Sequence, residues 1–340
     1  MYREITEVFD NHSNRDLSIL SIRLFIRVIT RLFGYKKSVA LLTYFSKFYK
    51  FFFNTKIFHF SLYIIEINIF RNKCLYLLRL GKLKEHELEK KKWAKFVIQN
   101  SKYNVAVNNA IDYLNLIDDY ENYNIMLSNV KPDDKLNFYF YGPNSAELNF
   151  HKNHVIVLTK PIKEDISKFK GSILFLNSYY FNKSVLNNKP FQAKLKQKYD
   201  KIFVSCKHSK LPEGFNRINP LSEFNSGYLS GPMALGRVLQ ILMKDYGKFN
   251  CIIDGYDFYL DSCPYNDNYS SSLRMSNGFF NDRMISWTLT DHDALYNFLL
   301  IKKIVSKLRI NNSSSFNDII NMSGNEYMEK LFKVVDFSKL

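Results

Sequence analysis

Cysteine, proline, glycine and tryptophan are all scarce in this chain of 340 residues, which contains 4 Cys, 8 Pro, 12 Gly and 2 Trp. The cysteines form no CxxC pair and no regular framework, so a disulfide-stapled fold is excluded and a reducing compartment is indicated. Cys206 and His208 have the spacing of two metal ligands, but no second pair follows them. We therefore interpret them as incidental neighbours.

Long apolar stretches are absent as well. No run of 18 or more apolar residues free of charge occurs, so the sequence predicts no membrane-spanning helix. The first residues, MYREITEVFDNHSNRD (1–16), are polar and acidic, which is not the pattern of a secretory signal peptide. With 46% hydrophobic residues the chain can still bury a full core, and we expect one large domain with an additional region.

Basic residues are in excess: 48 Lys and Arg against 32 Asp and Glu give a formal net charge of +16. AT-rich genomes enrich Lys, Asn, Ile, Phe and Tyr by themselves, so this total is a weak indication of nucleic-acid binding. The distribution is more informative, since residues 17–82 contain twelve basic residues and one acid, Glu66. The twelve are Arg23, Arg27, Arg31, Lys36, Lys37, Lys47, Lys50, Lys56, Arg71, Lys73, Arg79 and Lys82.

The start of this basic region predicts a helix. The segment LSILSIRLFIRVITRLF (17–33) spaces three arginines four residues apart, which places them on one helix face, and Gly34 is expected to end the helix. Residues 41–70 then interleave lysines with aromatic residues. This composition favours a surface that lies against anionic lipid headgroups. Ordinary helical packing and binding of single-stranded nucleic acid are the alternatives, the second being the least favoured.

Further helices are expected over the charged segment 82–96 and over residues 106–130, after which KPDD (131–134) breaks the pattern. We place the main boundary here. Residues 1–130 are predicted to form the basic, aromatic-rich helical region, and residues 131–340 the main domain.

Short apolar runs then alternate with helical patterns, the clearest helix being residues 231–247. This alternation predicts an α/β fold with a Rossmann-like, mainly parallel sheet and helices on both faces. Ligands bind such sheets at the carboxyl ends of the strands. The five expected strands are 136–142, 154–160, 171–177, 201–205 and 249–255.

Residues just after these strands have the chemistry of a nucleotide–phosphate pocket: small hydrogen-bonding groups, a helix N-terminus and two phenols. Ordinary loop chemistry is the alternative reading for any one of them. Ser230 is a predicted N-cap, and the first turn after it would present free N–H groups to an anion. The candidates are Gly142 and Asn144, Asn177 and Ser178, Ser230, and Tyr259 and Tyr265.

Two segments, FNSGYLSG (224–231) and GYDFY (255–259) with a second tyrosine six residues later, carry a resemblance to a known family. Residues 224–265 resemble the bacterial sialyltransferases of glycosyltransferase family 42, which transfer sialic acid from CMP-sialic acid to lipo-oligosaccharide. The first segment is similar to a family loop that ends in Ser-Gly at a helix start, and the second matches another family segment without a gap. Weaker similarity, as in ILFLNSYYF (173–181) and TDHDALYNFL (290–299), extends the resemblance over about residues 136–305.

The resemblance implies a GT-A-like sialyltransferase variant in which Asn177, Ser230 and Gly231 contact the CMP-sugar. It also implies that Tyr259 and Tyr265 donate hydrogen bonds to the departing CMP phosphate. Two positioned O–H donors can replace a divalent metal in this role, so no metal or other cofactor is expected. DHD (291–293) fits an Asp-x-Asp metal motif literally, but it lies at an expected helix start.

The chain departs from the family pattern in three places. Gly227 stands where the family has an arginine, whose contact Arg237, Arg274 or Arg283 would have to supply. The first-strand turn reads YGPNS (141–145) rather than Gly-Asn-Gly-Pro-Ser, and Asn144 is our choice for the nucleotide contact.

The third departure is the absence of the family's catalytic histidine before the Thr-Asp pair. His292 is the closest candidate for the general base, with Asp291 or Asp282 as substitutes and an uninvolved surface histidine as the alternative. If Thr290 capped the helix in a capping box with Asp293, His292 would lie in the first turn. A helix N-terminus disfavours imidazolium, so the ring would stay neutral and able to accept a proton.

These observations predict an inverting, metal-independent transferase of sialic acid from CMP-sialic acid to a cell-surface glycan such as lipooligosaccharide. One alternative is a different CMP-activated sugar acid, another nonulosonic acid or Kdo. The other is a non-catalytic basic binding protein with a degenerate transferase domain. We expect a cytoplasmic protein, peripheral on the inner face of the bacterial inner membrane through residues 17–82, with no nucleic-acid partner. The sequence is compatible with a monomer and with a homo-oligomer.

Overall fold

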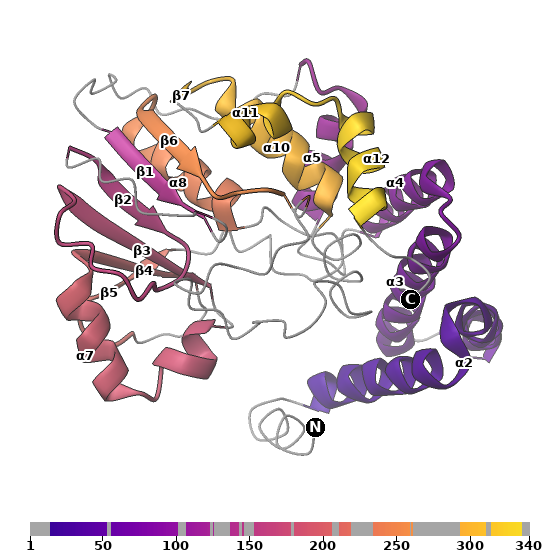
Figure 1. Cartoon of the computed structure of the whole chain (residues 1–340). Helices are drawn as coiled ribbons and strands as arrows, with labels where there is room; N and C mark the ends of the chain where they lie inside the picture. Colours follow the sequence, from indigo (N-terminus) through magenta and orange to yellow (C-terminus); the bar gives the residue numbers. More distant parts are fainter. Residues whose placement is uncertain are drawn as a thin grey trace. The chain divides into compact units, whose positions relative to one another are not determined.

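The computed structural model describes most of the chain (Figure 1). The described residues are 14–52, 56–100, 107–122, 125, 137–142, 145, 153–177, 180–205, 211–218, 234–258, 260, 293–310 and 314–334. The chain forms two compact units, Met1–Leu114 with Phe337–Leu340 and Asn115–Asp336, and each is described by itself. The predicted boundary between residues 130 and 131 lies outside the described residues.

The first unit is helical, as residues 17–33 and 82–96 predicted. It contains α2 (Asn14–Phe52), α3 (Lys56–Arg79), α4 (Leu83–Gln99) and most of α5 (Val107–Asp118). The helix predicted over 106–130 is shorter than expected, because α5 ends at Asp118. In the described part of the chain, no helix is long and apolar enough to cross a membrane.

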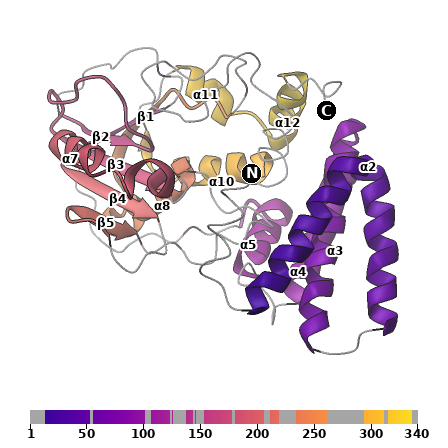
Figure 2. The same cartoon turned by 90° about the horizontal axis from the view of Figure 1, so that it is seen from below.

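Helix α2 is bent at Gly34, whose backbone angles of φ 68° and ψ 173° lie outside the helical region (Figure 2). Glycine adopts positive φ without the steric cost that a Cβ brings. The prediction that Gly34 ends the first helix is therefore confirmed, and a second helical arm, residues 35–52, follows the bend. The side chains of Arg23, Arg27 and Arg31 lie outside the described part of the structure.

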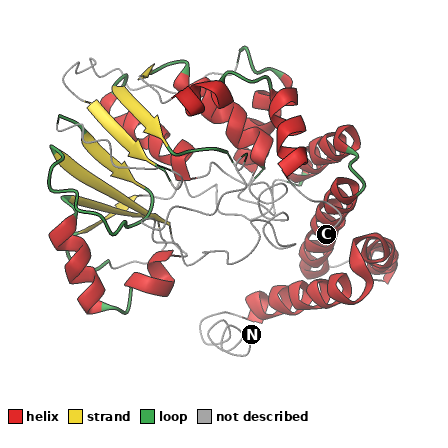
Figure 3. Ribbon diagram, in the orientation of Figure 1, coloured by secondary structure: helices red, strands yellow, loops and turns green. Residues whose placement is uncertain are grey.

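The second unit is built on a seven-stranded sheet in the order β5-β4-β3-β2-β1-β6-β7, in which every neighbouring pair is parallel (Figure 3). All five predicted strands are present, while β5 and the two-residue β7 were not predicted. The strands are β1 (Asn137–Tyr141), β2 (Val155–Leu158), β3 (Gly171–Asn177), β4 (Lys201–Ser205), β5 (Phe215–Ile218), β6 (Asn250–Asp254) and β7 (Arg309–Ile310).

Both faces of the sheet are covered, as predicted. On one face, alternate strand residues such as Tyr139 and Leu174 form a buried core with the π-helix η2 (Phe181–Val185) and with α7 (Lys189–Lys198). The opposite face packs against α8 (Ala234–Tyr246), where the rings of Phe138 and Tyr246 lie 5.7 Å apart. The fold is thus a Rossmann-like α/β sheet.

Three helices complete this unit: α10 (Ala294–Val305), α11 (Ser314–Ile320) and α12 (Gly324–Val334). The rings of Phe298 on α10 and Tyr327 on α12 stack with centroids 4.3 Å apart. Both side chains are fully buried. These helices form a second apolar cluster, and the segment that follows β6 is attached to it.

Candidate functional site

The strand order reverses between β1 and β6. From β1 the chain builds outward through β2, β3, β4 and β5, and it then returns to the other side of β1 with β6. In open parallel sheets, ligands bind outside the carboxyl ends of the strands at such a switch point. The segment GYDFY (255–259) begins directly after β6. The structure therefore brings its first residues to the place where this fold class binds ligands.

Two glycines let the backbones after β1 and β6 approach each other closely. Gly142 N donates to Asp254 O at 2.8 Å and to Ser145 Oγ at 3.2 Å. A Cβ on Gly142 would overlap the backbone carbonyl of Gly255, and a Cβ on Gly255 would overlap the backbone of Ser145. Gly255 also has φ +67°. The turn at Gly142 is thus packed directly on the turn at Gly255.

Asp254, the last residue of β6, is held by a tyrosine from β1. The hydroxyl of Tyr139 donates to Asp254 Oδ2 at 2.9 Å. Burial, together with the nearby Asp254 carboxylate, raises the pKa of Tyr139, so this phenol remains a neutral donor. Burial likewise raises the pKa of Tyr141 to about 12, with Glu164 and Asp254 adding to the effect. A carboxylate is therefore fixed beside the switch point.

Polar groups continue along the same sheet edge at β3 and β4. Asn177 pairs in register with Ser205, and Arg237 Nη1 from α8 donates to Ser205 Oγ at 3.4 Å. Burial lowers the pKa of Arg237 from its usual value, which indicates a largely desolvated guanidinium. Asn177 Oδ1 accepts a hydrogen bond from Tyr180 N at 2.7 Å, so this bond does not use its amide NH₂ group. Asn177 lies two strands away from Gly142 and two residues further along the strand direction, so strand spacing and rise place the two about 12 Å apart.

Lys160 is a cation at this edge that our sequence reasoning missed. It lies two residues after the end of β2, next to the buried Thr159. Burial lowers the pKa of Lys160 to about 8. The rule that residues after each strand carry the site would have found it, because LTK (158–160) stands directly at a strand end.

The segment after β6 is anchored at Phe258, which has an unusual positive φ of 52°. Its ring packs edge-on against Phe298 with centroids 5.7 Å apart. Its carbonyl oxygen accepts a hydrogen bond from the buried hydroxyl of Tyr327 at 3.0 Å. Left-handed backbone in a bulky residue costs about 1–3 kcal/mol and persists where the surroundings hold it. Phe258 directly precedes Tyr259, so the backbone leading to this predicted catalytic residue is fixed.

Asp293, the residue directly after His292, also has a positive φ, of 41°. The prediction that Thr290 caps this helix is wrong: Asp293 is the N-cap of α10, its Oδ1 accepting from Tyr296 N at 3.1 Å. Because the helix begins after Asp293, His292 precedes the cap instead of lying in the first turn.

Tyr327 connects these two places. Burial raises the pKa of the Tyr327 hydroxyl, and the negative charges of Asp257 and Asp293 raise it further. Tyr327 therefore bonds to the residue before Tyr259 and interacts electrostatically with the residue after His292. Sequence reasoning missed Tyr327, because nothing in NEYMEK (325–330) indicates a contact with Phe258, 69 residues earlier.

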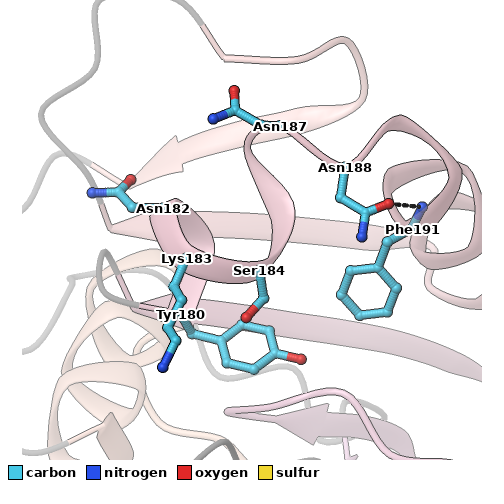
Figure 4. Close-up of a pocket in the computed structure, with 7 residues that line it drawn as sticks. All are labelled: Tyr180, Asn182, Lys183, Ser184, Asn187, Asn188 and Phe191. Atoms are coloured by element: carbon cyan, nitrogen blue, oxygen red, sulfur yellow. Dashed lines mark hydrogen bonds between the residues drawn. The ribbon is translucent and has the colours of Figure 1, made fainter. Parts of the chain in front are cut away.

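A surface pocket opens beside the carboxyl end of β3, on η2 and the start of α7 (Figure 4). It combines two aromatic rings with amides, a hydroxyl and an ammonium group, which are groups that sugars meet in proteins. Asn188 Oδ1 accepts from Phe191 N at 3.1 Å and fixes one wall. The lining residues are Tyr180, Asn182, Lys183, Ser184, Asn187, Asn188 and Phe191.

Of the residues predicted from sequence, the structure places Gly142, Asn177 and Arg237 at the carboxyl edge of the sheet. The other candidates lie outside the described residues: Asn144, Ser178, Ser230, Gly231, Tyr259, Tyr265 and His292, with Gly227, Arg274, Asp282, Arg283 and Asp291. Among the residues that are described, no group of three His, Cys, Asp or Glu side chains could hold a metal ion.

Comparison of the chain with models of known protein families, with curated proteins and with solved structures finds no match.

Proposed function

We propose that this protein is an inverting, metal-independent glycosyltransferase that moves sialic acid from CMP-sialic acid to a cell-surface glycan. The observation that carries the proposal is the position of β6 beside β1 at the switch point of the sheet. GYDFY follows β6 directly, and it is the segment in which the chain resembles family 42 sialyltransferases. The GT-A-like sialyltransferase arrangement is part of this proposal.

In the proposed reaction, an acceptor hydroxyl oxygen attacks the anomeric carbon of the donor sugar. The bond from that carbon to the phosphate oxygen breaks, and CMP leaves with the electron pair. Tyr259 and Tyr265 donate hydrogen bonds to the phosphate as its negative charge grows. A base, His292 or one of Asp291 and Asp282, takes the proton of the attacking hydroxyl.

Two cations at the sheet edge are suited to the anionic donor. Arg237 on α8, which contacts Ser205 at the end of β4, can supply the guanidinium that Gly227 does not provide, because a partly desolvated arginine binds phosphate or carboxylate through two parallel hydrogen bonds. Lys160 lies after β2, nearer to the switch point. Both give favourable electrostatics for a nucleotide phosphate without a metal.

The test is CMP release from CMP-sialic acid, measured with a lipooligosaccharide acceptor in the presence and absence of EDTA. We expect acceptor-dependent release that EDTA does not reduce. CMP-Kdo serves as a second donor: CMP release from it, but not from CMP-sialic acid, would show that the enzyme uses a CMP donor with a different sugar. Failure to release CMP from either donor, combined with tight and salt-sensitive RNA or DNA binding, would show that the domain is a non-catalytic basic module.

Replacing Tyr327 with phenylalanine is expected to lower turnover about tenfold and the free energy of unfolding by about 1–2 kcal/mol. Without the hydroxyl, the Phe258 carbonyl loses the hydrogen bond from Tyr327, and the backbone before Tyr259 is held less firmly. The control is Tyr199→Phe, which removes another buried phenol, one whose oxygen accepts from Ile162 N at 3.0 Å. It should cost similar stability and leave kcat unchanged. Equal kcat losses in the two variants would reduce the role of Tyr327 to structural support alone.

A peripheral position on the inner face of the bacterial inner membrane would bring such an enzyme to a glycolipid acceptor. Donor binding, as proposed, does not require the membrane, so the two properties can be tested separately.

A further inference from the structure

Helix α2 exposes an unusual concentration of large apolar side chains. Of the eleven large hydrophobic residues that the described part of the chain exposes, eight belong to α2: Phe25, Val28, Leu32, Phe33, Leu41, Tyr44, Phe45 and Phe48. Leu32 and Tyr44 are each 72% exposed. Single exposed apolar residues are ordinary, whereas a group of this size on one element marks an interaction surface.

Seven of these eight side chains, all except Phe33, form one surface on the two arms of α2. Residues three, four and seven positions apart lie on the same side of a helix. The rings of Phe25 on the first arm and Phe45 on the second lie 5.2 Å apart, which joins the two sides. This α2 apolar face comprises Phe25, Val28 and Leu32 with Leu41, Tyr44, Phe45 and Phe48.

The opposite side of α2 is bonded to α3, so the apolar face of α2 points away from α3. Asn72 Nδ2 on α3 donates to Thr30 Oγ1 at 3.0 Å and to Ser38 Oγ at 3.2 Å. These acceptors lie on either side of Gly34, and Asn72 and Ser38 are both buried. One amide therefore fixes both arms at the bend.

The charge around the α2 apolar face is positive. Lys37, four residues before Leu41, is exposed on the same side, and the exposed Lys47 follows Tyr44 by three residues. The single acid in residues 17–82, Glu66, is already paired with Lys50 at 2.5 Å and accepts from Ser46 Oγ at 3.2 Å. Lysines beside apolar groups extend toward anionic headgroups while their stems stay among apolar chains.

We propose that the α2 apolar face docks on the surface of a lipid bilayer that contains anionic lipid. Leu32, Tyr44 and their neighbours enter the boundary between headgroups and acyl chains, and Lys37 and Lys47 contact lipid phosphates. A second copy of this chain would bring the same lysines into mutual repulsion, whereas an anionic bilayer complements them. The proposal does not rest on the transferase function.

The test is flotation of the full chain with vesicles of pure phosphatidylcholine and with vesicles containing 30% phosphatidylglycerol. We expect binding to the anionic vesicles and at least tenfold weaker binding to the neutral ones. Leu32→Ser with Tyr44→Ser should weaken binding to anionic vesicles at least tenfold, because both side chains leave water on docking. Lys37→Gln with Lys47→Gln should weaken it about fivefold per lysine and reduce its salt dependence.

Matched controls come from exposed residues of the same unit outside α2. Leu80→Ser with Leu88→Ser removes two leucines that are 49% and 54% exposed, and Lys84→Gln with Lys95→Gln removes two exposed charges. Both controls should bind as the parent does. Parent-like binding by Leu32→Ser with Tyr44→Ser overturns the proposal. Equal binding to both vesicle types overturns the choice of anionic lipid. If the parent binds no vesicles and sediments as a dimer, and if Leu32→Ser with Tyr44→Ser dissociates that dimer, the surface is assigned to a second copy of the chain.

Discussion

Replacing Tyr259 and Tyr265 together with phenylalanine is expected to lower kcat for CMP release by about 10⁴-fold or more. Each donor to a developing oxyanion is worth about 10²–10³ in rate, and phenylalanine keeps the ring while removing the O–H. Since the loss arises only in the transition state, kcat should fall while KM for the CMP-sugar changes little. The measurement is CMP release under donor saturation.

Tyr246→Phe is a suitable control for the tyrosine pair. This phenol belongs to the last turn of α8 and packs on Phe138 near the start of β1, at the opposite edge of the sheet from the candidate site. We expect its kcat to equal that of the parent. A double variant of Tyr259 and Tyr265 that retains kcat within a few-fold would eliminate the phosphate-donor role and, with it, the proposed mechanism.

Gly255→Ala is expected to lower the free energy of unfolding by about 3 kcal/mol or more. The added Cβ would overlap the backbone and hydroxyl of Ser145, and alanine must also adopt φ +67°. Backbone cannot move aside without separating the turns after β1 and β6. Urea unfolding followed by far-UV circular dichroism measures the change.

Two further variants separate the causes of this loss. Gly142→Ala introduces overlap with the backbone of Gly255 and Asp254 without a positive φ, and we expect about 2–3 kcal/mol. Gly214→Ala has φ +81°, but its Cβ meets the flexible side chain of Lys196, with Cδ at 2.9 Å. It should cost about 1 kcal/mol. If Gly255→Ala were no worse than Gly214→Ala, the close contact at the switch point would not be needed for stability.

Local sequence patterns were sufficient to predict the elements whose structure depends on residues close by in the chain. The five strands found from sequence are continuous apolar runs, which is the pattern of strands buried on both faces. Gly34 was recognised as a helix end because only glycine tolerates its backbone angles easily. β5 was missed because FNRI (215–218) contains two exposed polar residues and reads as a loop. The start of α10 was misplaced because Thr290 and Asp293 are both good caps, and local sequence does not choose between them.

The sequence was enough to predict which residues follow the strands at the candidate site, but not how those residues are arranged in space. Reading the residues after each strand found Gly142 and Asn177 and indicated that the GYDFY segment follows a core strand. It gave no information on which strands are neighbours. The hydrogen bonds from Tyr139 to Asp254 and from Tyr327 to Phe258 join residues 115 and 69 positions apart in the chain. Contacts at such separations depend on packing, which composition and periodicity do not encode.

By itself, the sequence determined that this protein contains a parallel α/β sheet and a helical N-terminal part, because the apolar periodicity and the glycine positions that indicate these elements act over a few residues. Only the tertiary structure decided that β6 lies beside β1, that two glycines bring their turns into backbone contact, and that Tyr327 holds the segment leading to Tyr259. The physical reason is that strand order is chosen by the burial of whole faces against distant helices. That choice depends on side chains far apart in the chain acting together.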